Sequence, residues 1–422
     1  MATPRADAYT AAAGGVIYGG RERPQWHDAV PLRQWYSVPG TNFKTLAAAL
    51  MPYGNYPGSD PVAALVDAFG EPCFDPNEMA VYCHGGGHTD GLNNAVVKVD
   101  LTTLAHTLAI PPCDPAKWPP IYVATTTDRH GTLQYPSGAT PEYYSSTLTD
   151  PRDTPYNQLI DTPMVTHQYG GMAIRQGRIT YFYNQYKEAD VRAARWSHIG
   201  GVDLGAQLNA INPNYKNGVL GQGTMALYDD VTDRHYVTLV PGDAGYNWRG
   251  GFIAFNPVTR QLDGNKIANV PTRSSMNFFK GGRYAYGLMH DVAAPNKGWR
   301  FNLDTWAVEY LVFTGDPMSY VDGSVPLMET LIANYHSGRG SIVRWGGNFD
   351  MDALYEVNVS GAPLGGNGSA GNPYQFAQVR IPIAGSRPAA PVTQINRMYF
   401  NPATGCILML PRANSNWIAV KL

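Results

Sequence analysis

The sequence predicts an all-β protein, and within that class a β-propeller of about six four-stranded blades. Three observations support this prediction. Charged residues make up only 15% of the 422 residues, while Tyr, Gly and Pro are abundant, which is typical of all-β chains with many turns. One hairpin pattern recurs along the chain. The last repeat unit lacks a strand, and a segment near the N-terminus can supply it.

The recurring pattern is an apolar strand, a short polar turn and a second strand with alternating apolar residues. Each copy predicts a β-hairpin. Units of roughly 45–60 residues match the repeat length of propeller blades. The six hairpins are predicted at residues 73–83, 172–183, 226–240, 277–288, 332–345 and 398–410.

A third strand follows each hairpin and usually ends in Asp or Asn. Asx side chains bond to their own backbone two residues on, so this position predicts a turn. A weaker fourth strand then closes the unit, as in residues 308–312. The clearest third strands end at Asp100, Asn256, Asn302 and Asn358.

The chain ends predict how the ring closes. The last unit, residues 395–422, has room for three strands, and residues 32–38 read as an isolated outer strand that completes it. Such pairing removes exposed sheet edges. The alternatives are an open β-solenoid or sandwich, or seven blades if residues 111–161 hide one. We interpret 111–161 as a long insertion, 1–28 as an N-terminal docking arm and 29–422 as the propeller.

Charge and hydropathy limit the partners. The net charge is −2 and no run of Lys or Arg occurs, so nucleic-acid binding is not expected. No stretch approaches the roughly 18 apolar residues of a membrane span, and the N-terminus does not resemble a signal peptide. We therefore predict a virion or extracellular protein without membrane insertion.

The four cysteines, Cys73, Cys83, Cys113 and Cys406, match no zinc-binding spacing. They are expected to be buried thiols that behave as small apolar side chains.

Two family resemblances follow from local motifs. Residues 81–94, Val-Tyr-Cys-His-Gly-Gly-Gly-His-Thr-Asp-Gly-Leu-Asn-Asn, lead to the strand 97–101, which ends in Asp-Leu. This segment resembles kelch-type propeller repeats, and residues 164–171 resemble the entry of the next kelch-like blade. Residues 4–11 and 17–21 are similar to the start of some phage tail and virion proteins.

The candidate site lies on one face of the predicted ring. Loops after second strands and loops before first strands emerge on the same face, so they gather distant residues around one mouth. Aromatic rings and planar polar side chains suit sugars, which predicts glycan binding. The candidate ligand-binding residues are His84, His88, Asp90, His167, Tyr186, Tyr246, Trp248, Arg249 and His290.

No cofactor is expected, although a divalent metal is an alternative. Its ligands would be His84, His88 and His167, since zinc takes three or four protein ligands. The competing interpretation is that His84 hydrogen-bonds within its blade and that the adjacent glycines serve turns.

The favoured function is non-enzymatic: a recognition or structural propeller, associated with a phage virion or tail, that binds a glycan or other virion subunits. The alternative is a polysaccharide lyase acting on the same face. His88 or His167 would be its base, Tyr169 its acid, and Arg249 would neutralise the substrate carboxylate. The sequence leaves open whether the protein is an enzyme.

Two further expectations concern residues outside this site. His235 and His336 fall in or beside turns on the opposite face and are expected to be surface or turn residues. The tryptophans in strand patterns are expected in the core between blades; they are Trp196, Trp299, Trp345 and Trp417.

Overall fold

The chain is mostly β, as predicted, and its strands form several antiparallel sheets. The computed structural model describes residues 25–53, 60–67, 72–85, 93, 95–112, 171–182, 186–198, 202–211, 224–239, 251–270, 277–288, 296–318, 332–345, 352–388 and 397–422. Within these residues there are four four-stranded sheets and one sheet of eight strands.

The strands group into consecutive meanders, which we call units 1 to 6. Unit 1 contains β2 (Cys73–Asp75), β3 (Ala80–Cys83), β4 (Val96–Asp100) and β5 (His106–Ile110). Unit 2 contains β6 (Met172–Arg175), β7 (Arg178–Phe182), β8 (Tyr186–Asp190) and β9 (Arg195–His198). Unit 3 contains β10 (Ala226–Asp229), β11 (Arg234–Thr238), β12 (Gly251–Asn256) and β13 (Gln261–Asn269).

Units 4 and 5 together make the eight-stranded sheet. Unit 4 contains β14 (Asn277–Gly281), β15 (Tyr284–Leu288), β16 (Lys297–Asn302) and β17 (Val308–Gly315). Unit 5 contains β18 (Ile332–His336), β19 (Ser341–Trp345), β20 (Ala353–Asn358) and β21 (Tyr374–Pro382). Unit 6 contains β22 (Met398–Asn401), β23 (Cys406–Met409), β24 (Ile418–Lys421) and, from the chain start, β1 (Tyr36–Ser37).

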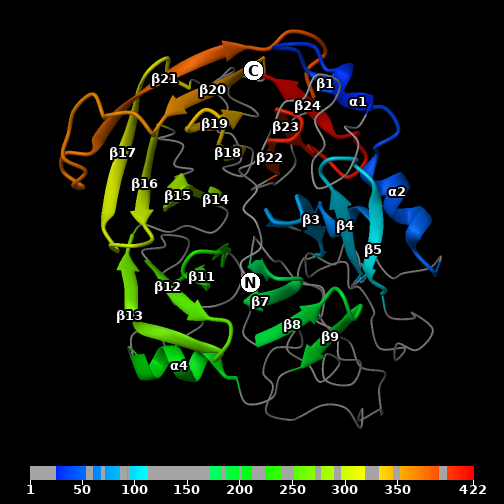
Figure 1. The fold of residues 1–422 in the computed structure, drawn as a ribbon, viewed down its shortest axis with the longest axis horizontal. Coiled ribbons are helices and arrows are strands. Elements are labelled where there is room, and N and C mark those ends of the chain that lie inside the picture. The colour runs from blue at the N-terminus through cyan, green and yellow to red at the C-terminus, as the bar shows by residue number, and fades with distance from the viewer. Residues whose placement is uncertain are drawn as a thin grey trace, which may run out of the picture.

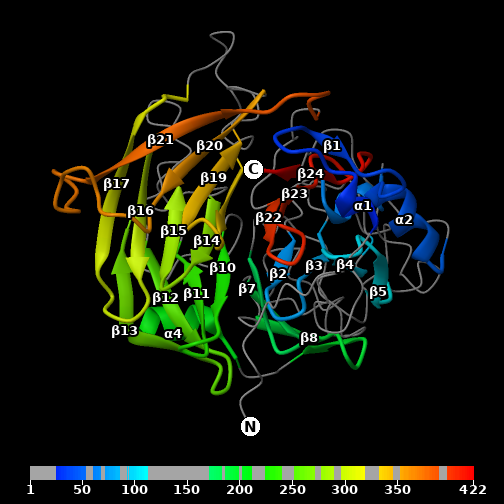
Figure 2. The ribbon, with the colours of Figure 1, turned by 45° about the horizontal axis from the view of Figure 1, so that its top comes forward.

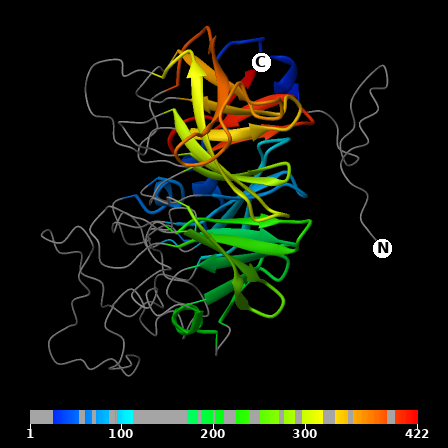
Figure 3. The same ribbon diagram turned by 90° about the vertical axis from the view of Figure 1, so that its left-hand side faces the viewer.

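The units follow one another around a common centre (Figure 1), and their first strands lie side by side in chain order from β2 to β22. Seen edge-on, the strands run across one layer (Figure 3). The arrangement is propeller-like. We call the face where first strands begin and second strands end the upper rim. The face that carries the turns between first and second strands is the lower rim.

A hydrophobic cluster fills the interface between each pair of neighbouring units, including units 6 and 1. In β3, Val81 and Cys83 pack toward unit 6, whereas Ala80 and Tyr82 pack toward unit 2. Both faces of the sheet are therefore buried, which explains strands that are apolar on both sides.

The core predictions are confirmed where the structure describes them. Trp299, Trp345 and Trp417 are fully buried in these clusters. Cys73, Cys83 and Cys406 are buried, and no disulfide joins these three cysteines. Cys113 and the side chain of Trp196 lie outside the described residues.

The chain ends pair as predicted. Tyr36 lies opposite Ala419 and Ser37 opposite Ile418 in the antiparallel pair of β1 and β24. The preceding residue, Trp35, is buried and its ring centroid lies 5.6 Å from that of Trp345. The first described segment is therefore part of the last sheet.

The turns after third strands also form as predicted. Asp100 Oδ1 accepts hydrogen bonds from the backbone N–H groups of Thr102 and Thr103 at 2.8 and 2.9 Å. Asn302 Oδ1 accepts in the same way from the second and third residues after it. Each turn then ends on a left-handed residue, Leu104 or Trp306.

Short helices were not expected from the sequence. They are α1 (Gln25–Asp28), α2 (Phe43–Leu50), α4 (Leu204–Ile211) and a 3-10 turn at Ala63–Leu65. The α2 helix packs on β5 and α4 packs on β13, so each covers an outer strand. None of the described helices is long and apolar enough to cross a membrane.

The outer edges of units 4, 5 and 6 are joined by backbone pairing that the sequence did not predict. β17 pairs with β21 in parallel, with Phe313 opposite Phe376, and β21 runs along the perimeter (Figure 2). Beyond β21, Gln34 forms a parallel bridge with Ala384. Units 4, 5 and 6 are therefore joined by backbone hydrogen bonds at their outer edges, and we call units joined in this way laced.

His235 and His336 lie beside turns as expected, but the expectation that they lie at the surface is wrong. His235 is fully buried and His336 nearly so, because each packs against the neighbouring unit rather than pointing to solvent. The His336 ring stacks on the Phe400 ring with 3.6 Å between the ring centroids. The His235 ring packs against the Phe182 ring with 5.6 Å between the centroids.

The predicted docking arm and insertion lie almost wholly outside the described residues. Of the arm, residues 25–28 form α1. The ring of His27 contacts the carbonyl oxygen of Thr404, and Lys421 Nζ donates to the carbonyl of His27 at 2.8 Å. The end of the arm thus lies against unit 6.

Replacing Trp35 by Ala tests the closure by β1. Trp35→Ala should lower the free energy of unfolding by about 3 kcal/mol, because it removes a buried aromatic side chain between units 5 and 6. The control Leu32→Ala changes an exposed side chain in the same segment and should cost less than about 0.5 kcal/mol. Urea unfolding measures both, and equal losses would contradict the assignment.

Candidate functional site

The upper rim carries the predicted site, and the structure describes one of its predicted side chains, that of His84. For Tyr186 the structure describes the backbone alone, as the first residue of β8. The others lie outside the described residues: His88, Asp90, His167, Tyr169, Tyr246, Trp248, Arg249 and His290.

His84 follows β3 and is fully buried. Its Nδ1 lies 3.0 Å from the carbonyl oxygen of Ala95, while Asn93 Oδ1 accepts from the backbone N–H of Ala95 at 3.1 Å. These contacts tie together the two ends of the glycine-rich segment. The interpretation that His84 hydrogen-bonds within its own unit is confirmed, and the imidazole acts by positioning the base of this loop.

Among the described residues, no three His, Cys, Asp or Glu side chains gather where they could bind a metal. Two members of the proposed metal set, His88 and His167, lie outside those residues.

A buried arginine lies just below the upper rim between units 4 and 5. Arg344, the fourth residue of β19, is fully buried, and its Nη1 donates to Gln378 Oε1 at 2.6 Å. Gln378 Nε2 donates to Asn296 Oδ1 at 3.2 Å and to the carbonyl of Asp316 at 2.8 Å. Asn296 is half-buried and Asp316 exposed. A chain of hydrogen bonds thus connects the guanidinium to the rim surface.

A second buried arginine lies at the upper rim between units 6 and 1. Arg397 immediately precedes β22, and its Nη1 lies 3.4 Å from Asp67 Oδ1. The same carboxylate accepts from the backbone N–H of Ala413 at 3.1 Å. Asp67 therefore holds the strand entry of unit 6 to the segment before unit 1.

Burial shifts both guanidinium groups in the same direction. It lowers the pKa of Arg344 to about 9, and it lowers the pKa of Arg397 although Asp67 opposes that shift. Arginines are rarely fully buried unless they are paired. Charges in a low-dielectric interior act more strongly on their surroundings than exposed charges do. Arg397 already has an anionic partner in Asp67, and Arg344 donates to the side-chain amide of Gln378.

Sequence reasoning missed both arginines. One signal for a buried arginine was available in the sequence. Arg344 lies within the apolar run Ser341–Trp345, where a charged side chain needs buried hydrogen-bond partners. Those partners lie dozens of residues away, so the spacing alone could not identify them.

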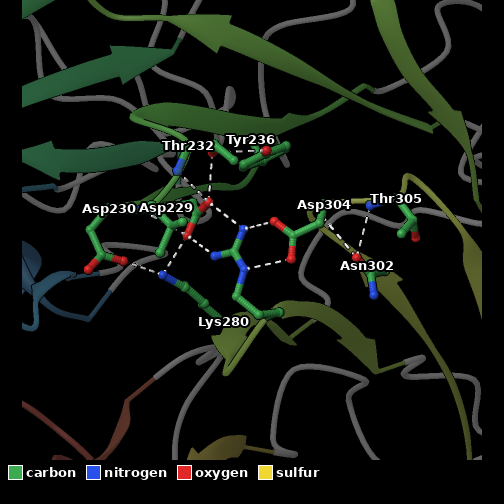
Figure 4. Close-up of polar contacts among 10 residues, drawn as sticks. Asp229, Asp230, Thr232, Tyr236, Lys280, Asn302, Asp304 and Thr305 are labelled. Carbon is green, nitrogen blue, oxygen red and sulfur yellow. Dashed lines mark hydrogen bonds and ion pairs between the residues drawn. The ribbon is translucent and has the colours of Figure 1, made fainter.

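The lower rim carries an ionic cluster between units 3 and 4 (Figure 4). Asp229, fully buried at the end of β10, accepts from Arg283 Nη1 at 2.8 Å and lies 2.6 Å from Lys280 Nζ. Arg283 also donates to Asp304 at 2.6 and 2.9 Å. Thr232 Oγ1 donates to Asp229 at 2.6 Å. The cluster is internally satisfied, so we assign it a structural role.

Burial by itself would raise the pKa of Asp229. Hydrogen bonds from Arg283, Lys280 and Thr232 outweigh burial and hold the pKa far below its ordinary value. The ionised Asp229 carboxylate stabilises the fold fully above the ordinary aspartate pKa of about 3.9. This stabilisation is lost only as the pH falls through the lower pKa that Asp229 has in the folded protein. The ionic cluster around Asp229 therefore keeps its stabilising effect in mild acid.

Comparisons with known proteins identify no family. No family model matches the chain, and no curated protein matches it. Solved structures are similar at 10% identity: YjhT (88% of this chain, 95% of that chain, TM-score 0.40) and a gluconolactonase from Xanthomonas campestris (88%, 99%, 0.41). A third is an auxiliary nutrient binding protein from Bacteroides thetaiotaomicron (87%, 74%, 0.39). None of the three is named as a kelch or phage protein.

Asp229→Asn tests the lower-rim cluster. It leaves Arg283 and Lys280 facing a neutral amide between two units and should lower the free energy of unfolding by about 3 kcal/mol. The matched control is Asp304→Asn, at an exposed partner of the same Arg283, where the loss should be much smaller. Thermal unfolding at neutral pH compares them, and an equal effect would contradict the buried role of Asp229.

Proposed function

We propose that the protein is a six-bladed β-propeller that recognises a glycan at its upper rim without chemically altering it. The blade count is supported by the division of the eight-stranded sheet into two meanders whose strands pair through β17 and β21. It is also supported by the hydrophobic cluster at each of the interfaces between neighbouring units.

The observation that carries the proposal is the ring geometry. The pairing of β1 with β24 and the cluster between units 6 and 1 join the chain ends. The first strands of all units therefore begin at the same rim. Residues predicted from separate loops, such as Trp248 and Tyr186, would then share one mouth. Propeller rims are common places for such sites because their loops vary independently of the blades.

We propose that the glycan is acidic. The support is Arg249, which the sequence predicts at the surface of the upper rim, with the buried Arg344 beneath that rim; the charge of Arg397 is matched by Asp67. Guanidinium groups bind carboxylates in a planar, two-point geometry. Uronate-containing or sulfated polysaccharides have the matching chemistry.

We further propose that residues 1–24 dock the propeller onto another subunit of a virion or tail. The support is the predicted arm sequence and the contact of α1 with unit 6, which places the end of the arm at the ring.

Titration calorimetry with acidic and neutral polysaccharides tests glycan recognition. Arg249→Ala should weaken binding at least tenfold, since a charge-assisted hydrogen bond contributes about 1.5–3 kcal/mol. Arg339→Ala removes an exposed arginine from the lower rim, in the turn after β18, and should leave affinity unchanged. Absence of binding across the whole panel, or equal losses in the two variants, would overturn the proposal.

The same panel separates recognition from lyase chemistry. A lyase would release an unsaturated sugar that absorbs in the ultraviolet, and we expect no such product. If it accumulates and is lost in His88→Ala, His167→Ala or Tyr169→Phe, the protein is an enzyme and the non-catalytic proposal is wrong.

Limited proteolysis tests the docking arm. In the isolated chain, cleavage should occur within residues 1–24 well before cleavage within the sheets, because an undocked arm lacks buried backbone. Protection of this segment in the purified monomer would count against a docking role.

A further inference from the structure

Among the described residues, backbone pairing between units is confined to half of the ring. Units 4 and 5 are joined by β17 and β21, and units 5 and 6 by residues 33–35 and 384. At the seam of units 6 and 1, the N–H of Lys44 in α2 donates to Ala413. In the described part of the chain, no backbone hydrogen bond crosses between units 1 and 2, 2 and 3, or 3 and 4. These interfaces depend on side chains.

The interface of units 2 and 3 has two ion pairs near the lower rim. Arg175 at the end of β6 donates to both carboxylate oxygens of Asp233, at 2.5 and 2.6 Å. Arg260 reaches Glu188 with two hydrogen bonds of 3.3 Å. Both pairs join the two units.

His235 lies between these units, fully buried beside the Arg175–Asp233 pair. Its Nε2 lies 3.2 Å from Thr180 Oγ1 of unit 2. Aromatic rings enclose the imidazole: Tyr228 at 5.4 Å, Phe182 at 5.6 Å and Phe255 at 6.1 Å. Its Nδ1 is buried and has no hydrogen-bond partner among the described residues.

This environment accepts a neutral imidazole and opposes a charged one. When Nε2 donates to Thr180, Nδ1 can remain unprotonated, so no N–H group is buried without an acceptor. An imidazolium has donors at both nitrogens, and a buried unpaired donor costs free energy.

The charged groups facing His235 do not compensate for a proton. Arg175 from β6 repels it. Asp233 attracts it, but this carboxylate is already bound by Arg175 and by the Tyr228 hydroxyl at 2.8 Å. The side chains facing it from β7 and β12, Thr180, Phe182 and Phe255, carry no charge.

We propose that the interface of units 2 and 3 is an acid-sensitive joint, in which protonation of His235 separates the lower-rim ends of β6–β7 from those of β10–β11. Backbone hydrogen bonds at the interfaces of units 4 and 5, 5 and 6, and 6 and 1 hold those units together while this joint opens.

The direction of the pH effect follows from the two states of His235. Burial lowers the pKa of His235 in the closed joint to about 3, with Arg175 adding to that shift. In the open joint the pKa returns to about 6.5. Closure is therefore fully favoured above pH 6.5 and weakens continuously as the pH falls below it. Between pH 7.5 and 5.0 the opening equilibrium should rise about 30-fold.

Hydrogen exchange with mass spectrometry on the full chain measures this opening at pH 7.5 and 5.0, after correction for intrinsic exchange rates. Peptides from 172–182 and 226–238 should lose protection about 30-fold at pH 5.0, and peptides from 297–302 in unit 4, whose described residues include no histidine, should not. In His235→Gln, whose amide can still reach Thr180 but cannot be protonated, this pH response should disappear.

His336→Gln is the matched control. His336 is also a nearly buried lower-rim histidine, stacked on Phe400 and facing Arg339 and Glu356, but it lies between the laced units 5 and 6. The response at units 2 and 3 should persist in this variant. Unchanged protection of the wild-type peptides at pH 5.0 would overturn the proposal without any variant, as would a response that survives His235→Gln.

Discussion

Every unit of this fold buries both of its faces, and the rest of the structure depends on that constraint. A sheet with apolar side chains on two sides needs two neighbours, and only closure gives the first and last units their second one. The cluster between units 6 and 1 supplies that contact, with Trp417 fully buried within it. The stability of any one unit is thus tied to closure, which explains why residues from the start of the chain are built into the last sheet.

The local features of this architecture were predictable from sequence because they depend on neighbouring residues. Alternating apolar residues identify strands such as Ala80–Cys83, and Asp100 marks the turn that follows β4, because its side chain accepts hydrogen bonds from the second and third residues after it. Closure was predictable for a related reason. The last unit was one strand short, and residues 32–38 had no other unit to join.

Features that depend on distant partners were not predictable. The parallel pairing of β17 with β21 joins residues about 60 positions apart, and no residue pattern distinguishes an outer edge that is covered from one that is free. Position beside a turn suggested that His235 was exposed, but the neighbouring unit covers it. The buried Arg344 was missed because its partner Gln378 belongs to another strand. At the upper rim, the loops that the sequence predicts to share one mouth lie outside the described residues, so that part of the site stays a prediction.

The two rims differ in what holds them. At the lower rim, Asx turns and ion pairs such as Asp229–Arg283 use nearly all their polar groups internally, which leaves little capacity for a ligand. At the upper rim, the Arg344–Gln378 chain leads outward to the half-buried Asn296 and to the exposed Asp316. If the joint opens as proposed, the strands of units 2 and 3 connect that opening to the upper rim, because each strand spans the distance between the rims. In the proposed site, Tyr186 belongs to unit 2 and Arg249 to unit 3, the pair that the His235 joint connects. A glycan that contacts both would bind the closed joint better than the open one. By linkage it would then oppose protonation of His235 as strongly as protonation opposes glycan binding.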